Sequence, residues 1–145
     1  MNFEKAKPED KKDILEISNL LYIESIPQFV WNTPEYITRQ IESGEYFLAK
    51  DGQKTAGIIS FRERWGKMYV ETLAVTKEYQ LNGIGALMLD FAKKIAKEKG
   101  FRTLNICSFY EYNALDFYLK NGFSLLRKPG KYNRHKFYRF EINLE

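Results

Sequence analysis

Residues 73–89 of the chain read LAVTKEYQLNGIGALML and decide how it is interpreted. The short aliphatic run Leu73–Val75 is typical of a buried strand. Gly83 and Gly85 follow it, and apolar residues recur at helical spacing from Ile84 onwards. Glycines at such a junction let the backbone turn sharply and let a ligand come close. The first N–H groups of a helix lack intrahelical partners and lie at the positive end of its dipole, so the junction predicts either a phosphate site or a plain strand–helix turn.

Two familiar phosphate motifs do not fit this junction. The dinucleotide-binding fingerprint G-x-G-x-x-G needs a third glycine at the position where Met88 stands. A Walker loop needs Gly-Lys followed by Ser or Thr, and this combination is absent from the sequence. If the junction binds phosphate, it therefore belongs to another class of site.

Alternation and turn signals predict the elements around the junction. Asp51-Gly52 and Trp65-Gly66 mark two tight turns between strands. Strands are expected over residues 2–6, 45–50, 54–63, 68–75, 103–108, 123–128 and 135–143. Helices are expected to begin at Pro8 and Pro34, to span Asn82–Lys99, and to end at Lys120. This order predicts a mixed α/β fold, in which the central strand–helix–strand unit gives parallel neighbours and the hairpins give antiparallel ones.

Length and composition limit the class of protein. The chain has 145 residues, which predicts a single domain over 1–145. Lys and Arg number 23 and Asp and Glu 19, and the net charge of +4 is too small to require nucleic acid. One cysteine and one histidine exclude a disulfide framework and a zinc site built only from nitrogen and sulfur ligands. No apolar run approaches the ~18 residues of a spanning helix, and the polar N-terminus is unlike a signal peptide, so a cytoplasmic protein is expected.

Two segments resemble motifs of the GNAT superfamily of N-acetyltransferases. Gln80–Gly85 fits the superfamily's Q/R-x-x-G-x-G/A signature, and Leu73–Val75 fits its fourth strand. Ala114–Phe123 resembles its A-x-x-F-Y-x-x-x-G-F segment. The chain departs from the usual pattern at Lys77 and Asn82, where the superfamily commonly has Pro and Lys. It also has Glu111 where an asparagine is usual, with Asn113 two residues later.

The resemblance implies a fold and a co-substrate. The fold is the acyl-CoA N-acyltransferase fold, a central mixed and mostly antiparallel sheet flanked by about four helices, with strands four and five splayed. The co-substrate is acetyl-CoA, and no metal is needed. The resemblance assigns cofactor binding to the fourth-strand residues Leu73, Ala74 and Val75, to the loop residues Gln80, Leu81, Asn82, Gly83, Ile84, Gly85 and Ala86, and to Asn113. The backbone N–H groups of Leu81–Ala86 would hold the pyrophosphate.

The resemblance also suggests the catalytic groups. Tyr118 matches the tyrosine that protonates the departing CoA thiolate; the alternative is a core aromatic in an aromatic-rich chain. Glu71 is the first candidate for the base that removes the acceptor's proton, since half-burial would raise the pKa of its carboxyl; the alternative is a strand-face Glu without a role. Glu111 or a chain of waters could act instead. A Cys107–His135 nucleophile is rejected, because Cys107 lies in a strand expected to be buried and buried thiols are usually inert.

The predicted reaction is acetyl transfer to an amine of a small molecule or peptide, by direct attack in a ternary complex. Six cations and no acid lie between Lys120 and Glu141, which indicates either a solvated hairpin or a basic rim for an acceptor that carries carboxylate or phosphate. Aromatic residues that could form the acceptor pocket, or merely pack locally, are Tyr22, Phe29, Trp31 and Tyr36. The alternatives are a non-catalytic acyl-CoA-binding module and an RNA- or ribosome-associated protein. Membrane association is not expected, and a homodimer through the C-terminal strands is compatible with the sequence.

Overall fold

The computed structural model describes residues 1–26 and 29–145, and these form two compact units. Unit 1 comprises Met1–Phe61 and Glu71–Met88, and unit 2 comprises Arg62–Val70 and Leu89–Glu145. The chain crosses between the units within two strands and one helix, so each of these contributes a part to both. The prediction of a single domain stays a prediction.

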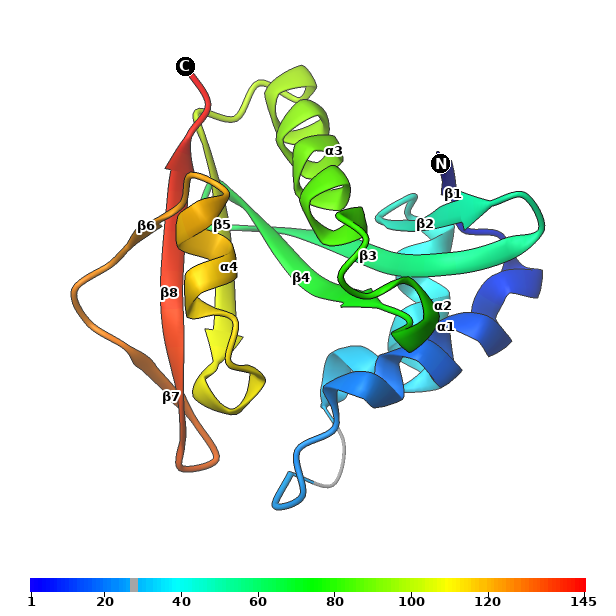
Figure 1. Ribbon diagram of the computed structural model, residues 1–145, viewed down its shortest axis with the longest axis horizontal. Coiled ribbons are helices and arrows are strands. Elements are labelled where there is room, and N and C mark those ends of the chain that lie inside the picture. Colours follow the sequence, from blue (N-terminus) through cyan, green and yellow to red (C-terminus); the bar gives the residue numbers. More distant parts are fainter. Residues whose placement is uncertain (27–28) are drawn as a thin grey trace. The chain divides into compact units, whose positions relative to one another are not determined.

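The described residues of unit 1 form two strands, two helices and parts of three shared elements (Figure 1). Its own elements are β1 (Asn2–Lys5), α1 (Lys11–Ser18), α2 (Pro34–Glu42) and β2 (Tyr46–Asp51), and the shared ones are β3 (Lys54–Arg64), β4 (Lys67–Val75) and α3 (Ile84–Glu98). Short 3-10 turns lie at Pro8–Asp10, Asn19–Leu21, Val30–Asn32 and Lys77–Tyr79.

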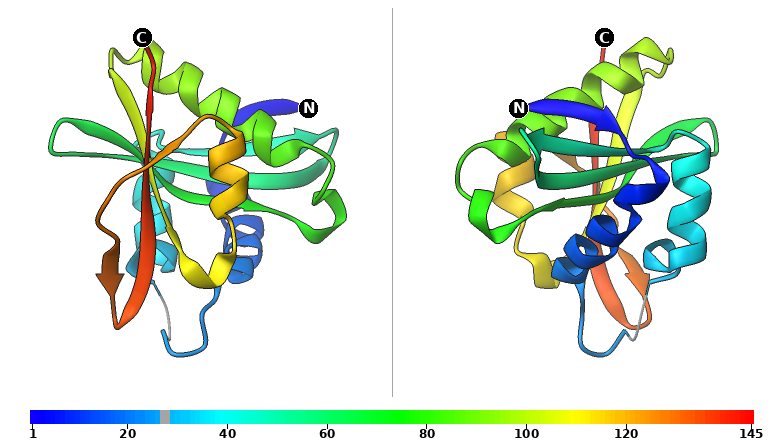
Figure 2. Two further views of the ribbon diagram at one scale, coloured as in Figure 1. Left: turned by 60° about the vertical axis from the view of Figure 1, so that its left-hand side comes forward. Right: turned by 90° about the vertical axis from the view of Figure 1, so that its right-hand side faces the viewer.

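The sheet of unit 1 follows the order β1-β2-β3-β4, and its registered pairs are antiparallel. Helices α1 and α2 lie beside each other against these strands (Figures 1 and 2). Their apolar faces meet alternate strand residues in one core cluster, whose fully buried members include Ile14, Ile37, Tyr46, Leu48 and Ile58. The predicted hairpin is confirmed, since Gly52 has the positive φ of 61° that its turn requires.

Unit 2 holds the remaining elements around the second half of the sheet. They are β5 (Thr103–Phe109), α4 (Leu115–Lys120), β6 (Ser124–Leu125), β7 (Gly130–Tyr132) and β8 (His135–Asn143), with a 3-10 turn at Tyr110–Tyr112. The strand order is β4-β5-β8-β6, and β7 also pairs with β8. β4 and β5 are parallel over Met68–Val70 and Leu104–Ile106, whereas β8 is antiparallel to its three partners. The predicted parallel strand–helix–strand unit is therefore confirmed, and the splay of these strands beyond the paired segment stays a prediction.

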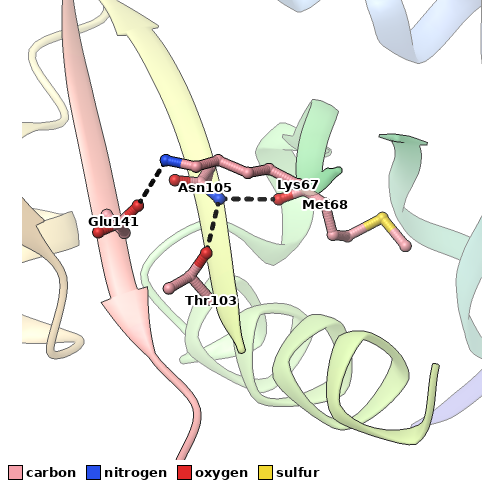
Figure 3. A network of polar contacts seen from close by, with 5 residues as sticks. All are labelled: Lys67, Met68, Thr103, Asn105 and Glu141. Atoms are coloured by element: carbon pink, nitrogen blue, oxygen red, sulfur yellow. Dashed lines mark hydrogen bonds and ion pairs between the residues drawn. The ribbon is translucent and has the colours of Figure 1, made fainter. Parts of the chain in front are cut away.

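A buried asparagine links the parallel strands of unit 2 (Figure 3). The amide of Asn105, 3% exposed, donates hydrogen bonds to the Met68 carbonyl oxygen at 3.3 Å and to Thr103 Oγ1 at 3.1 Å. Beside it, Lys67 and Glu141 form an ion pair with an N–O distance of 3.3 Å. A buried amide is costly unless it is hydrogen-bonded, so these bonds favour the register in which β4 and β5 pair.

Three predictions differ from the structure. The strand expected over 123–128 spans only Ser124–Leu125, and β7 was not predicted; Pro129 separates the two, and a proline lacks the N–H that a continuous ladder needs. The helix expected from Asn82 begins at Ile84, because Gly83 has a positive φ of 77°. Cys107 is exposed, and the expectation of a buried thiol was wrong because an apolar strand sequence does not reveal which face is left uncovered.

Candidate functional site

The glycine-rich loop of unit 1 presents a run of unused backbone donors. Leu81, Asn82 and Gly83 are exposed, whereas Ile84 is buried and fixes the start of α3. Within the described residues, the N–H groups from Leu81 to Ala86 have no hydrogen-bond acceptor; the next amide, that of Leu87, donates to the Gly83 carbonyl oxygen at 3.2 Å. These donors precede and open a helix of 15 residues. They can therefore bind an anionic group such as a pyrophosphate.

Two contacts from the 3-10 turn before this loop hold it to the β2–β3 hairpin. The Tyr79 hydroxyl donates to Asp51 Oδ2 at 2.6 Å, and this bond raises the pKa of Tyr79 to about 12. Lys54 and Glu78 form an ion pair at 2.9 Å, although both side chains are largely exposed. The hairpin thus restrains the segment that joins β4 to the donor loop.

The predicted cofactor strand of unit 1 ends at this loop. Burial alternates along it as expected, with Leu73 and Val75 partly buried and Ala74 buried at 6% exposure. The Val75 carbonyl oxygen accepts a hydrogen bond from the Gln80 side chain at 3.0 Å. Gln80 therefore braces the loop against the strand end, and the resemblance to the family motif did not reveal this contact.

Glu71 is held by donors from helix α2. The Tyr36 hydroxyl donates to both carboxylate oxygens of Glu71, at 2.8 Å to Oε1 and 3.1 Å to Oε2. Gln40 Nε2 donates to Oε1 at 3.2 Å and to the Phe61 carbonyl oxygen at 3.3 Å. Half-burial was expected to raise the pKa of this carboxyl, but donated hydrogen bonds act in the opposite direction because they favour the charged form.

Tyr118 lies in unit 2 on α4, and its side chain is enclosed by aromatic rings. Its ring is 6% exposed and lies 4.9 Å from the Phe140 ring and 5.8 Å from the Phe123 ring, between centroids. The described residues offer its hydroxyl no hydrogen-bond partner. Burial raises the pKa of Tyr118 above its usual value of 10.0, and the nearby Tyr112 adds to the effect. The phenol is therefore protonated near neutral pH and can donate a hydrogen bond to a ligand.

The residues between β5 and α4 form a second group in unit 2. Asn113 is exposed and has a positive φ of 52°, a conformation that asparagine tolerates well. Glu111 is exposed, and its carboxylate pairs with Nδ1 of His135. This hydrogen bond holds the pKa of the Glu111 carboxyl below its usual value. Both candidate carboxylates thus accept donated hydrogen bonds, which favour their charged forms.

The contact between His135 and Glu111 also bears on the rejected nucleophile. In the β5–β8 register Cys107 stands opposite Arg139, whereas His135 lies beyond the end of that ladder. Within the described part of the chain, no contact joins the thiol to the imidazole. The histidine is therefore not placed to activate Cys107.

The four aromatic residues considered for the acceptor pocket differ in exposure. Tyr22 is 60% exposed, whereas Phe29 and Tyr36 are buried. The Phe29 ring is stacked on that of Trp31 with a centroid distance of 4.8 Å. Local packing thus accounts for most of this group.

The acid-free segment of unit 2 carries six exposed cationic side chains. The side chains of its six cations have no acidic partner among the described residues: Arg127, Lys128, Lys131, Arg134, Lys136 and Arg139. Lys131 and Lys136 are register partners on β7 and β8, so two like charges face the same side of the hairpin. Like charges in that arrangement are destabilising unless an anion lies near them.

A cavity elsewhere in unit 2 contains none of the predicted site residues. Its volume is about 780 Å³, and its lining includes Glu63, Lys67, Arg102, Thr103 and Glu141. It lies where β5 begins, whereas Asn113 and Tyr118 follow the end of that strand. Among the described residues there is no cluster of His, Cys, Asp or Glu that could ligate a metal, and no helix is long and apolar enough to cross a membrane.

Comparisons with known proteins identify the fold. An aminoglycoside 6'-N-acetyltransferase solved with coenzyme A matches with a TM-score of 0.82 and 14% identity, over 100% of this chain and 98% of that one. The PaiA N-acetyltransferase of Thermoplasma acidophilum, also in complex with coenzyme A, matches with a TM-score of 0.78 and 20% identity over 98% of both chains. A GNAT-family acetyltransferase of Staphylococcus aureus Mu50 matches with a TM-score of 0.79 and 22% identity over 99% of both chains.

These similarities confirm the predicted acyl-CoA N-acyltransferase fold, a mixed α/β architecture with a multi-stranded sheet and four flanking helices. None of the curated proteins matches the chain in sequence. The model of the acetyltransferase (GNAT) family matches residues 13–123, which include the donor loop, Glu71 and Tyr118. By this match, the chain belongs to the acetyltransferase (GNAT) family.

Proposed function

We propose that the protein transfers the acetyl group of acetyl-CoA to an amine by direct attack within a ternary complex. Members of the family take their acetyl group from acetyl-CoA and use no metal. The observation that carries the proposal is the run of N–H groups from Leu81 to Ala86, which have no acceptor within the described residues. Such a run at the start of a long helix fits the pyrophosphate of coenzyme A.

Acetyl-CoA supplies an activated acetyl thioester. The chain's own residues bind the co-substrate, accept a proton from the amine and donate to the departing sulfur. The loop donors bind the pyrophosphate, and backbone groups of Leu73 and Val75 pair with the pantetheine amides. Glu71 accepts the proton that the acceptor amine loses when its nitrogen bonds to the acetyl carbon. Tyr118 donates a proton or hydrogen bond to the sulfur as the carbon–sulfur bond breaks.

The burial of Tyr118 limits how this donation can work. A thiol has a pKa of about 8.5, so full transfer from a phenol whose pKa is raised is uphill. The hydroxyl can still stabilise charge as it develops on sulfur, because a hydrogen bond to an ionised group is about twice as strong as a neutral one. Placement of the hydroxyl, rather than its acidity, is thus its main contribution.

The exposed cations of unit 2 support an acceptor that carries carboxylate or phosphate. Each cation lacks an acidic partner in the described chain, so an anionic acceptor would gain attraction without displacing an existing ion pair. Raising the salt concentration should weaken the apparent affinity for such an acceptor and leave that for a neutral amine nearly unchanged.

The donor loop can be tested by calorimetric titration with acetyl-CoA. Gly83 and Gly66 have positive φ angles of 77° and 72°, and in both cases a Cβ would meet no atom within 4 Å. Gly83→Ala and Gly66→Ala therefore introduce similar backbone strain at two places. We expect the dissociation constant for acetyl-CoA to rise at least about tenfold in Gly83→Ala alone. Equal affinities in the two variants would contradict the assignment of the loop.

A further inference from the structure

Helix α2 presents two buried polar side chains to the carboxylate of Glu71. Tyr36 and Gln40 are four residues apart, which places them on one face of the helix. They are only 7% and 2% exposed. Burying a hydroxyl and an amide is costly unless each finds a partner, and both direct their donors to Glu71. The contacts join positions 31 and 35 residues apart in sequence.

The arrangement favours one protonation state of Glu71. Three donated contacts reach its two oxygens, at 2.8, 3.1 and 3.2 Å. An ionised carboxylate accepts all of them, whereas a protonated carboxyl must point its own hydrogen away from a donor. Tyr36 and Gln40 thus both face Glu71 as donors. A charged group on the same helix, the guanidinium of Arg39, lies 5.6 Å from the centroid of the Tyr36 ring.

A group of buried hydroxyls also lies near this carboxylate. Tyr46 on β2 is fully buried, and its phenol feels the charge of Glu71, while Ser60 and Thr72 stand near its hydroxyl. Burial raises the pKa of Tyr46, so this phenol stays neutral at the pH at which the enzyme would work. Tyr36, Gln40 and Tyr46 are thus neutral groups, and none of the three is a carboxylate that could share the proton of Glu71.

We propose that Tyr36 and Gln40 are positioning residues for acetyl transfer, which hold the Glu71 carboxylate ionised and fix the direction in which it accepts a proton. The inference rests on the proposed role of Glu71 as the base. It extends the site from the strand to α2, a helix to which the sequence motifs assign no part in the chemistry. Orientation matters because proton removal requires the base to lie within hydrogen-bond reach of the amine.

The direct test is a ¹³C-carboxyl NMR titration, with the Glu71 signal assigned by its loss in Glu71→Gln. Tyr36→Phe removes one donor and keeps the ring, and Gln40→Met removes the other at similar volume. We expect the titration midpoint of Glu71 to rise by about one pH unit in each variant, because each loses a bond that favours the charged form. Tyr110→Phe is the matched control, since Tyr110 is 37% exposed and belongs to unit 2, where its ring stacks on that of Tyr138.

Kinetics separate positioning from a merely structural role. If the two residues keep Glu71 ionised, the acidic limb of the kcat/KM profile moves to higher pH in both variants, by the same amount as the NMR midpoint. Activity of the variants then falls relative to that of the wild type on the acidic limb and matches that of the wild type at pH values well above this limb. A structural role would lower the rate equally at all pH values, and this result would overturn the inference.

The inference and the proposed role of Glu71 fail in different ways. Full activity in Glu71→Gln would remove Glu71 as the base, whatever the titration shows. An unchanged Glu71 midpoint in both Tyr36→Phe and Gln40→Met would overturn the positioning role, even if Glu71→Gln is inactive. Thermal unfolding verifies that each variant is folded, and if one variant fails to fold, the other still decides the outcome.

Discussion

Replacing Tyr118 with phenylalanine separates the proposed chemistry of the hydroxyl from the packing of the ring. The ring contacts with Phe117, Phe123 and Phe140 have centroid distances of 5.0, 5.8 and 4.9 Å, and phenylalanine can retain all three. The hydroxyl has no hydrogen-bond partner within the described chain, so its removal breaks no internal bond. We therefore expect the free energy of unfolding to change by less than about 0.5 kcal/mol, or to rise slightly.

The effect of the same substitution on the rate should be much larger. Positioned proton donors typically contribute about 10²–10⁴-fold, and loss of this one should lower kcat by roughly 10²-fold while acetyl-CoA affinity stays within about twofold. The assay is the release of free CoA thiol under saturating substrates, with calorimetry for affinity. Tyr110→Phe is the matched control, because Tyr110 is 37% exposed and its ring stacks on Tyr138 at 4.2 Å.

Dependence on pH adds a second criterion for Tyr118. Burial raises the pKa of this phenol above 10.0, so the hydroxyl remains protonated where an ordinary tyrosine begins to ionise. The contribution of the hydroxyl, measured as the ratio of wild-type to Tyr118→Phe rates, should stay constant up to about pH 10. Unchanged turnover in Tyr118→Phe would refute this account of the tyrosine. So would a ratio of wild-type to variant rates that already begins to decrease at a pH lower than 9.

Three further predictions concern packing, charge and the second carboxylate. Gly57→Ala should lower the free energy of unfolding by about 1–3 kcal/mol, measured by denaturant unfolding. The added Cβ would meet Met88 Sδ at 2.7 Å and the Ala74 carbonyl oxygen at 2.9 Å. A stability equal to that of the wild type would contradict this close packing. Lys131→Glu should raise the KM for a phosphate-bearing amine several-fold at low salt and leave that for a neutral amine unchanged, and equal effects on both would refute the basic rim. Glu111→Gln should leave the acidic limb of the kcat/KM profile in place, because Glu71 is the proposed base. Loss of the limb in this variant would identify Glu111 as the base instead.

Much of the fold could be predicted from local signals. Three signals reflect the backbone geometry of a single element and can be read from neighbouring residues. They are the turn glycines with positive φ, the helical period after Ile84 and the alternation along β4. The 3-residue strand β7 could not be predicted, because it depends on pairing with β8. Its turn uses Asn133 and Arg134 at positive φ, and arginine gives no signal for that conformation.

The candidate site was predicted less completely, because motifs identify residues and not their partners. The sequence singled out Glu71 and Tyr118, but not the bonds from Tyr36 and Gln40, which connect a helix to a distant strand. Tyr36 was considered as a pocket wall, whereas the structure buries its ring and directs its hydroxyl to Glu71. Contacts between segments far apart in sequence leave no periodic trace, and only the folded chain shows them.

The most direct test of the proposed function is amine-dependent release of CoA thiol from acetyl-CoA. The wild-type protein would be assayed with polyamines, amino acids, aminoglycosides and peptides, and the acetylated product identified by mass spectrometry. We predict that at least one amine yields one free thiol for each N-acetyl product formed, and that Tyr118→Phe slows this release without abolishing acetyl-CoA binding. Tight binding of acetyl-CoA with no amine-dependent thiol release across the panel would contradict the proposed transfer and indicate a binding module instead.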